Sequence, residues 1–505
     1  MPKLKSFTRP RLSAALLSAL LLTSSTGFAA DLTLQEVHTL GNLPVSAEAQ
    51  QAIAHLMGQP ISSELLEQVL AELSRYYQSQ GYRHAQALLP EQVIQADGSL
   101  DVYLANAQLG QIQVCQNPGD TLNPSAVKRL FSGILEMQGQ AVNEGELESA
   151  ILKLTDLGIF NLQGEFTPGA QMLTQDLTLN LTPMQSVAFS TFADNHGTVA
   201  SGRYRYGVNL NILNLSGNAD TLGLFYARSS HRQNNYSLLY QIPVNSHPTV
   251  IGATICLTDY ELGREYTDLG AEGKSWDASL FITEPLYRTP NHRTNFNGGY
   301  RYRKLTDEFT EFDIKFEQHS HAVWGAIDEV YVGEDFSFAG RAQLTIGKLT
   351  NDDDFSLYDE NIFKILNLNA LLSYRLNDEL SLNTELEVQY TPDDVDSSEE
   401  FVAGGASAVS GFDSNVLAAD SGALIKLYPE LKPFAGVDFA IRPNFKAAMV
   451  KDKYYPRDTL ASVGLELAAQ YQGLYATLSL DAALGDRPYD DLDDGKVWFE
   501  VGFRY

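Results

Sequence analysis

Residues 497–505, the last nine of the chain, alternate apolar and polar side chains and end on an aromatic residue. Successive side chains of a strand point to opposite faces, so Phe503 and Tyr505 would share one face with the other apolar residues of this segment. Residues 203–212 and 379–390 alternate in the same way, and their polar positions include arginine and glutamate. A dry core accepts such charges only with partners. An apolar outside around a charged inside is typical of an outer-membrane β-barrel, and we interpret Phe503 and Tyr505 as its C-terminal signal.

The whole region 185–505 continues this pattern, with one candidate strand after another and turn signals between them. Sixteen or seventeen strands can be counted. Single-chain bacterial barrels have an even number of strands, so we predict sixteen and merge the doubtful pair between Phe309 and Val332. A soluble β-sandwich, the alternative, would have to turn all of its charged faces outward.

The first thirty residues have the composition of an export signal. Basic residues at positions 3–11 precede an apolar run, Leu12 to Leu22, and a small-x-small site follows at 27–29. No later segment reaches the roughly 20 apolar residues of a membrane-spanning helix. We therefore expect residues 1–30 to be a signal peptide, and the mature protein to cross the inner membrane without staying in it.

Two similar segments lie between the signal and the barrel, at 31–106 and 107–184. Each shows the order strand, helix, helix, strand, strand in its periodicity. This is an internal repeat of about 75 residues. We expect two small α+β modules that pack against neighbours, since each is small for a domain that stands alone.

Charge and the reactive side chains exclude several function classes. With 63 acidic against 35 basic residues, the chain is not suited to nucleic acid. A disulfide could join Cys115 and Cys256, but two buried, unpaired thiols are the more common outcome. His319 and His321 would share one face of a strand, and no third ligand is near them in the sequence, so we predict no metal site. No nucleophile with a nearby base is evident either, so we predict neither catalytic residues, nor a cofactor, nor an enzyme.

Residues 76–92 carry an aromatic, a Gly-Tyr pair and a Leu-Pro-x-Gln turn, formed by Tyr76, Gly81, Tyr82, Leu89 and Pro90. This stretch resembles the first POTRA module of two-partner secretion transporters, the ShlB/FhaC/HecB-like proteins of the POTRA plus β-barrel superfamily. Further stretches that resemble motifs of this family lie at 194–220, 401–412 and 434–439, in the order in which the family has them.

The resemblance implies two α+β POTRA modules, POTRA 1 at 31–106 and POTRA 2 at 107–184. An all-β, antiparallel transmembrane β-barrel of about 16 strands with a re-entrant loop follows at 185–505. It also implies a location in the Gram-negative outer membrane with the POTRA modules in the periplasm. The modules would capture an unfolded secreted exoprotein through its N-terminal secretion domain, and the barrel would pass it to the cell surface without ATP.

Further partners are implied by the same resemblance: outer-membrane lipid and lipopolysaccharide, and the barrel-assembly machinery during biogenesis. The transporter itself would be a monomer. An assembly factor that inserts β-barrel proteins is the alternative, because such relatives share the modules, the barrel and the loop; two modules rather than more favour secretion. A passive porin or adhesin would leave the repeat unexplained.

The family loop that folds into the barrel reads Val-Arg-Gly-Phe or Val-Arg-Gly-Tyr, and its arginine meets an aspartate on the wall. The corresponding residues of this chain are Gly404, Gly405, Val409, Ser410, Gly411 and Phe412 for the loop, and Gly436 and Asp438 for the wall. Ser410 occupies the arginine position, so the ion pair is lost and we expect a less firmly held loop.

Asp438 would then stay hydrated, accept hydrogen bonds from Ser410 or from loop amides, or pair with another base of the barrel interior. The candidate bases are Arg203, Arg205, Arg301, Arg303 and Arg442. Since Asp31 to Leu34 enters the first strand almost directly, we also expect no plug helix, and the loop from Thr391 to Ser421 as the sole obstruction of the pore.

Overall fold

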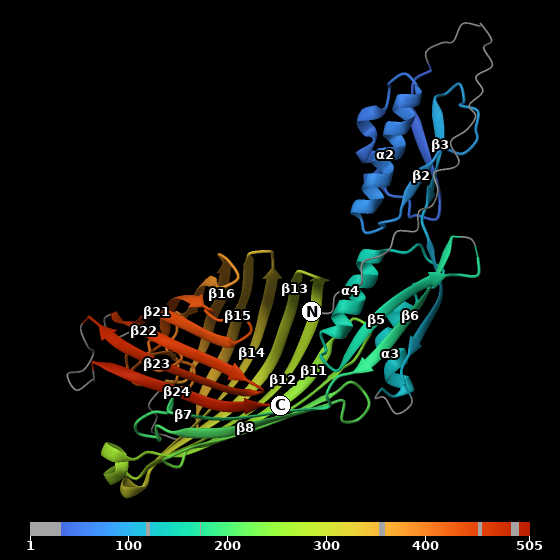
Figure 1. Ribbon diagram of the computed structural model, residues 1–505. Helices are drawn as coiled ribbons and strands as arrows, with labels where there is room; N and C mark the ends of the chain where they lie inside the picture. Colours follow the sequence, from blue (N-terminus) through green and yellow to red (C-terminus); the bar gives the residue numbers. More distant parts are fainter. Residues whose placement is uncertain (1–31, 118–121, 172, 353–358, 453–456, 486–493) are drawn as a thin grey trace. The chain divides into compact units, whose positions relative to one another are not determined.

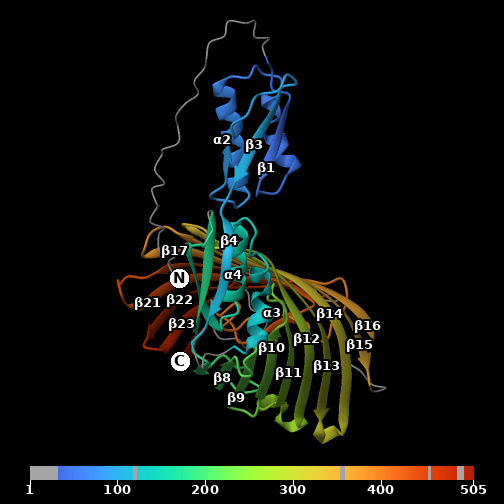
Figure 2. The same cartoon turned by 90° about the vertical axis from the view of Figure 1, so that its right-hand side faces the viewer.

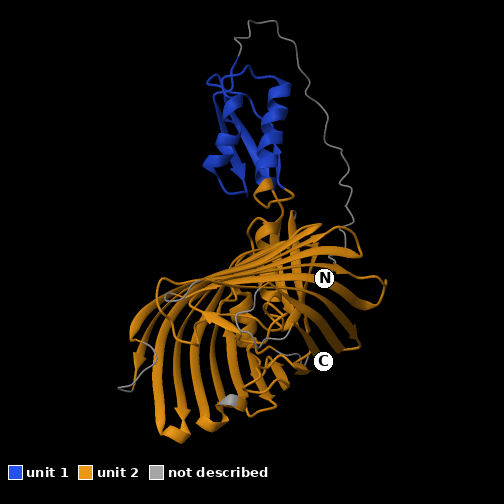
Figure 3. Cartoon of the chain, turned by 90° about the vertical axis from the view of Figure 1, so that its left-hand side faces the viewer, with its two compact units in different colours: residues 1–78, 85–105 blue, residues 79–84, 106–505 orange. Residues whose placement is uncertain are grey.

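The computed structural model describes residues 32–117, 122–171, 173–352, 359–452, 457–485 and 494–505 (Figure 1). The chain divides into two compact units, residues 1–78 with 85–105 and residues 79–84 with 106–505 (Figure 3). The predicted signal peptide, 1–30, lies outside the described residues.

The first unit is a three-stranded sheet with helices. Strand β3 (Ser99–Ala105) is central, parallel to β1 (Glu36–Gly41) and antiparallel to β2 (Gln86–Leu88). Between β1 and β2 lie α1 (Ala47–Ala52), the 3-10 helix η1 (Ala54–Leu56) and α2 (Ser63–Ser79). The buried residues of α2 recur every four positions, at Leu65, Val69, Leu73 and Tyr77, which is the spacing of one helical face.

The second unit begins with a module of the same topology. Its sheet places β6 (Thr174–Pro183) between β4 (Gln108–Cys115), which is parallel to it, and β5 (Phe160–Pro168), which is antiparallel. Helices α3 (Pro124–Leu135) and α4 (Glu144–Thr155) connect β4 to β5 and pack into a shared apolar core. The element order predicted for both modules is thus confirmed. Among the described residues, no helix has the length and apolar character needed to span a membrane.

The remainder of the second unit is a closed, antiparallel barrel of sixteen strands, as predicted. Strand β24 pairs with β7 and closes the sheet. The doubtful stretch after Phe309 forms the single strand β14. The strands are β7 (Val187–Asp194), β8 (Arg205–Leu213), β9 (Thr221–Ser229), β10 (Asn234–Pro243), β11 (Val250–Glu261), β12 (Ala271–Thr289), β13 (His292–Phe309), β14 (Ile314–Val332), β15 (Phe336–Asn351), β16 (Asn361–Arg375), β17 (Leu380–Tyr390), β20 (Ser421–Leu431), β21 (Asp438–Lys451), β22 (Asp458–Tyr471), β23 (Leu474–Leu484) and β24 (Gly495–Arg504).

The two faces of the barrel differ as the alternation predicts. Tyr204 and Tyr206 are more than half exposed on the outer face. Arg205, between them in the sequence, points inward and binds both oxygens of Asp194, at 2.9 and 3.0 Å. The charged positions of the alternating strands therefore line the interior, where they find partners or water.

The second module is tied to the barrel by charged contacts. The Asp156 carboxylate accepts hydrogen bonds from the Arg288 guanidinium at 2.7 and 3.0 Å. One turn earlier, burial lowers the pKa of the Lys153 ammonium in α4, while the charge of Glu284 acts in the opposite direction. Asn123, at the start of α3, donates to the Ser216 carbonyl in the β8–β9 turn. The module and this turn thus form a continuous interface.

Both cysteines are free, and the prediction that both are buried is wrong. Cys115 ends β4 and is exposed, whereas Cys256 is half-buried. Cys115 shares the exposed face of β4 with Gln111 and Gln113, because alternate side chains of a strand point to the same side.

Candidate functional site

The segment between β17 and β20, residues 391–420, lies against the inner face of the barrel wall and is called the inner loop below. It contains a short hairpin of β18 (Phe401–Ala403) and β19 (Leu417–Ala419). The hairpin and the residues at its tip form one apolar cluster with inward-facing wall residues. The cluster consists of Phe401, Ala403, Ala408, Val409, Phe412, Leu417, Ala419, Leu424, Ala448, Val450 and Leu460.

The tip of the inner loop, residues 408–414, is held by hydrogen bonds from the wall. Ser410 is fully buried, and its hydroxyl and the ammonium of Lys446 on β21 are 2.7 Å apart, with Lys446 donating. Its carbonyl accepts a hydrogen bond of 2.7 Å from the indole of Trp498 on β24. A buried polar group without a hydrogen-bond partner destabilises a protein. These two bonds therefore provide partners for the Ser410 hydroxyl and carbonyl, which would otherwise have none.

Gly411 brings the tip into direct contact with the wall backbone. A Cβ at this position would lie 2.8 Å from Ser462 Cβ and 2.9 Å from the Ala483 nitrogen, closer than carbon atoms approach in proteins. Gly404 and Gly405, in the turn after β18, have φ values of +100° and +101°, which other residues rarely adopt. Glycine is required at these loop positions for two different reasons, close approach and backbone conformation.

The wall partner of the tip differs from the prediction. Gly436 lies in the turn before β21, and a Cβ there would have no neighbour within 4 Å, so the expected notch for the loop is absent there. Asp438 opens β21 and is exposed. It has the inward parity that the sequence predicts, but the tip contacts Lys446 further along the same strand. The register between the loop and the wall, which periodicity does not define, makes the difference.

Asp413 provides the charged contacts of the tip. One of its oxygens lies 2.9 Å from the Arg203 guanidinium, and the other 2.7 Å from the Lys496 ammonium. The side chain of Lys496 is only 6% exposed, whereas that of Arg203 is 40% exposed. Ser414 adds a hydrogen bond of 3.0 Å to the carbonyl of His196. The tip therefore touches strands on both sides of the β24–β7 closure.

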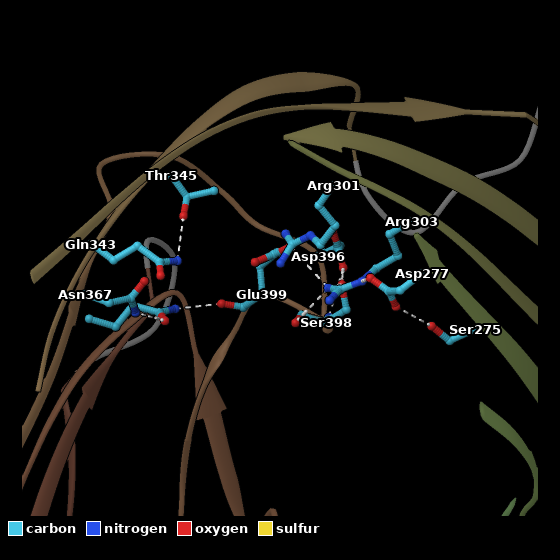
Figure 4. A network of polar contacts seen from close by, with 11 residues as sticks. Ser275, Asp277, Arg301, Arg303, Gln343, Thr345, Asn367, Asp396, Ser398 and Glu399 are labelled. Carbon is cyan, nitrogen blue, oxygen red and sulfur yellow. Dashed lines mark hydrogen bonds and ion pairs between the residues drawn. The ribbon is translucent and has the colours of Figure 1, made fainter. Parts of the chain in front are cut away.

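The root of the inner loop, residues 393–400, is attached to a different part of the wall (Figure 4). The Glu399 carboxylate accepts hydrogen bonds from Arg301 and Arg303, neighbours on the inner face of β13; the one from Arg303 measures 3.1 Å. Arg303 also binds Asp277 of β12, at 2.8 Å. The Glu399 carbonyl accepts a bond of 2.6 Å from Gln389. Because the Glu399 side chain is 10% exposed, this is a largely desolvated charge cluster.

The bases proposed for Asp438 all have other partners. Arg203 binds Asp413, Arg205 binds Asp194, and Arg301 and Arg303 bind Glu399. Arg442 lies between Glu430 and Glu466, at 2.8 and 2.6 Å. The expectation that one of these arginines pairs with Asp438 is therefore wrong, and sequence reasoning missed the acidic partners Asp413 and Glu399. Asp413 directly follows the recognised motif and could have been found; nothing in the pattern distinguishes Glu399 from its acidic neighbours.

One group near the tip has the residue types of a metal site. Asp194, His196 and Glu500 offer ligand atoms within 4.8 Å of one another. Both Asp194 oxygens already accept hydrogen bonds from Arg205, a cation that would compete with a metal ion. The pair His319 and His321 faces outward, where the rings contact Asp352 and Tyr300. We assign no metal to either group.

The POTRA motif residues have structural roles at the end of α2 and beyond it. The Tyr76 hydroxyl lies 2.8 Å from the hydroxyl of Ser46, the N-cap of α1. Gly81 has a φ of +97°, and its carbonyl accepts a hydrogen bond from Glu144, the first residue of α4. Tyr82 is half-buried, Leu89 is exposed and Pro90 is half-buried in the connection after β2. The contact between Gly81 and Glu144 thus lies within the second unit.

Two family profiles match the chain. Residues 174–439 match the family described as "Haemolysin secretion/activation protein ShlB/FhaC/HecB", and residues 32–105 match the family "POTRA domain, ShlB-type". The first match includes the inner loop and most of the barrel, and the second covers the first module.

Similar proteins agree with these matches. The heme/hemopexin transporter protein HuxB of Haemophilus influenzae is 24% identical over 480 residues, which cover 90% of this chain and 84% of HuxB. The outer membrane transporter CdiB of Escherichia coli is 22% identical over 416 residues, or 75% of this chain and 66% of CdiB.

Solved structures share the fold. CdiB from Escherichia coli superposes with a TM-score of 0.79 at 19% identity, covering 96% of this chain and 92% of CdiB. BamA from Haemophilus ducreyi lacking POTRA domains 1–3 superposes with a TM-score of 0.56 at 14% identity, covering 94% of this chain and all of the BamA chain.

Proposed function

The chain belongs to the haemolysin secretion/activation protein family ShlB/FhaC/HecB of two-partner secretion transporters, and we propose that it exports an exoprotein across the outer membrane. In this proposal the POTRA modules lie in the periplasm and capture the unfolded exoprotein through its N-terminal secretion domain. The barrel then passes the chain to the cell surface without ATP. The transporter works as a monomer, inserted by the barrel-assembly machinery into a membrane of phospholipid and lipopolysaccharide.

The observation that carries the proposal is the way the inner loop occupies the barrel. It is bound to the wall by hydrogen bonds and ion pairs, and by an apolar cluster confined to one side, with no covalent link among the described residues. Polar contacts of this kind exchange readily for water, since each contributes only about 0.5–3 kcal/mol net. An obstruction held in this way closes a resting pore and leaves it able to open.

Capture of the exoprotein is supported by the edges of the two small sheets. In the first module β1 and β2 are the outer strands, and in the second β4 and β5 are. The backbone groups on the outer side of an edge strand are available to an extended segment, which gains hydrogen bonds while little of its own sequence is read. This chemistry suits a partner that is still unfolded.

The interior of the barrel supports passage of an extended chain. Outside the apolar cluster under the inner loop, its inward positions are rich in charged and amide side chains, such as Arg205, Asn209 and Glu387, which give apolar segments no dry surface to bind. Folding outside the cell buries apolar surface on that side only. Direction then comes from the free energy of folding, and no nucleotide is needed.

The experiment uses the full-length transporter in liposomes and, as the candidate exoprotein, a long secreted protein chosen from the reading frames next to its gene. Its unfolded N-terminal secretion domain, labelled with a fluorophore, is added to the POTRA side without nucleotide. We expect the label to reach the opposite side of the membrane, where protease added on the POTRA side no longer cleaves it. We expect deletion of residues 32–105 to abolish this protection. Transport that requires ATP, or that persists without the POTRA module, would overturn the proposal.

The assembly-factor alternative is tested in the same liposomes. An unfolded outer-membrane barrel protein is supplied in place of the secretion domain, and its insertion is measured by resistance to protease and to heat in detergent. We expect insertion at the rate seen in empty liposomes. Accelerated insertion without export of the secretion domain would favour the alternative.

A further inference from the structure

The outer face of strands β12–β16 carries a concentration of basic side chains at one end of the barrel. Five of the chain's fifteen lysines point outward here: Lys274, Lys304, Lys315, Lys348 and Lys364. The five strands lie side by side in the wall (Figure 2). Acidic side chains, among them Glu272, Glu308 and Glu317, occupy outward positions at the same end, so the lysines that lack an acidic partner are the informative ones.

These lysines mark the edge of the apolar band. On β15 the outward residues run from the exposed Leu344 and Ile346 to Lys348. On β16 they run from Leu368 and Leu366 to Lys364, with Ile362 as the last outward residue of the strand. An apolar row that gives way to lysine is typical of the boundary between hydrocarbon and headgroups.

The boundary is at the end of the barrel opposite to the second module. The second module leads into the start of β7, and adjacent strands alternate in direction, so the end of β15 and the start of β16 lie at the far end. The orientation in the proposed function makes this the extracellular end. The further inference therefore rests on the proposed function.

Some of the basic groups already have acidic partners. Glu317 lies 3.5 Å from Lys304 and 2.6 Å from Lys315, and Asp352 lies 2.8 Å from His319. Lys274 is directly opposite Asp259 in the register of β11 and β12. For Lys348 and Lys364, which are exposed, the described residues provide no ion pair. These two charges are the ones available to a ligand.

The two lysines are close to each other and to an aromatic group. Ile346, two residues before Lys348, is directly opposite Lys364, so the two lysines are diagonal neighbours on adjacent strands. His321 is directly opposite Lys348 on the other side. The Tyr302 ring lies 5.0 Å from the His321 ring, and the Trp276 ring 5.4 Å from that of Tyr302. Tyrosine and tryptophan favour the membrane–water interface, where one edge is dry and the other wet.

We propose that Lys348 and Lys364, with the His321–Tyr302 group beside them, bind a phosphate of the lipid A part of lipopolysaccharide. The outer leaflet supplies this phosphate at the depth of the boundary. Two ammonium groups on neighbouring strands provide donors for its oxygens. The acyl chains of the same molecule run along the apolar rows below, over Ile346, Leu344 and Leu366. The lipid is bound on the side of the barrel whose inner face carries Arg301 and Arg303, which anchor the root of the inner loop.

The experiment compares two double variants of the full-length transporter in detergent. Lys348→Gln with Lys364→Gln removes the proposed site. Lys451→Gln with Arg457→Gln removes two positive charges from exposed positions at the same end of β21 and β22, and serves as the matched control. Both are first checked for the heat-dependent shift in gel mobility of a folded barrel. Binding of heptose-free lipopolysaccharide is titrated, and lipid retained by each protein is counted by native mass spectrometry.

Each lysine near a membrane surface contributes enough to change affinity about fivefold, so we expect the Lys348/Lys364 variant to bind about 25-fold more weakly. We expect the control variant to bind as the natural protein does. Lipid A from which both phosphates have been removed should bind the natural protein as weakly as it binds the variant. Inorganic phosphate up to millimolar concentrations should not compete.

Three results would overturn the inference. Equal affinity of both double variants for lipopolysaccharide would mean that Lys348 and Lys364 are hydrated and do not contact the lipid. Undiminished binding of dephosphorylated lipid A would mean that acyl chains alone are recognised. Full competition by inorganic phosphate would indicate a site for free anions. Export of the secretion domain, measured on the same variants, separates this inference from the proposed function, because lipid binding can be lost while export continues.

Discussion

The tip and the root of the inner loop are attached to the barrel by different chemistry. At the tip, Ser410 makes neutral and singly charged hydrogen bonds, and Asp413 divides its charge between a buried lysine and a half-exposed arginine. At the root, one carboxylate, Glu399, is enclosed by two arginines that are both mostly buried. The tip is therefore held by several separate hydrogen bonds and ion pairs, and the root by one enclosed charge cluster.

This difference suggests that the tip and the root have different roles in a family member without the loop arginine. Separate hydrogen bonds and ion pairs are disrupted one at a time, whereas a buried charge cluster must be released or retained as a whole. We infer that the root fixes where the loop lies and that the tip is the part that yields first. The three predictions below test this inference.

The largest effect is expected at the root, from Glu399→Ala. Removal of the carboxylate leaves Arg301 and Arg303 without their shared anion, which costs about 3–5 kcal/mol for a buried pair. The ratio of closed to open pores should fall by a factor of about one hundred or more. Single-channel recordings in planar bilayers measure this ratio.

The matched control is Asp335→Ala, which removes the acid of an exposed pair with Arg375; the two side chains are 59% and 53% exposed. Exposed pairs contribute about 0–1 kcal/mol, so its channels should behave as those of the natural protein. If Glu399→Ala and Asp335→Ala gave the same recordings, the root would not hold the loop.

An intermediate effect is expected at the tip, from Asp413→Asn. The change leaves the buried Lys496 ammonium without a countercharge, while water compensates Arg203. A charged hydrogen bond contributes about 1.5–3 kcal/mol, so the open fraction should rise by about 10- to 100-fold. Cleavage of the loop by a protease added from the loop side provides a second measurement.

The second substitution Lys496→Met tests the cause. Replacement of both partners removes the buried unpaired charge, so the double variant should be closer to the natural protein than Asp413→Asn alone. A double variant as open as the single one would show that the lysine is not the origin of the effect.

The smallest effect is a coupling energy between Ser410 and Lys446. Ser410→Arg restores the family residue, but in this chain it places a guanidinium beside a buried ammonium, so we expect a looser tip. Lys446→Ser in the same chain relieves the repulsion. A double-mutant cycle on open probability should give a coupling of about 1 kcal/mol in favour of the double variant. Additive effects would mean that the two side chains do not interact, contrary to their 2.7 Å contact.

Much of the fold followed from local rules. Alternation at 203–212 and 497–505 predicted the faces of β8 and β24, and helical spacing predicted α2 to within a residue or two. These properties depend on neighbours in the sequence. The burial expected for Cys115 did not come from these rules and was wrong; the alternation of β4 places this side chain on the exposed face.

The same distinction between local and tertiary information applies to the candidate functional site. The sequence by itself determined which faces are charged, that a loop with special glycines follows β17, and which arginines point inward. Only the tertiary structure decided that Ser410 meets Lys446 and Trp498 rather than Asp438, and that Glu399 binds Arg301 and Arg303. These pairs join residues far apart in the chain, and their distances depend on how the barrel closes and how deep the loop reaches. No local periodicity encodes either quantity, because side-chain alternation specifies a face and not a height along it.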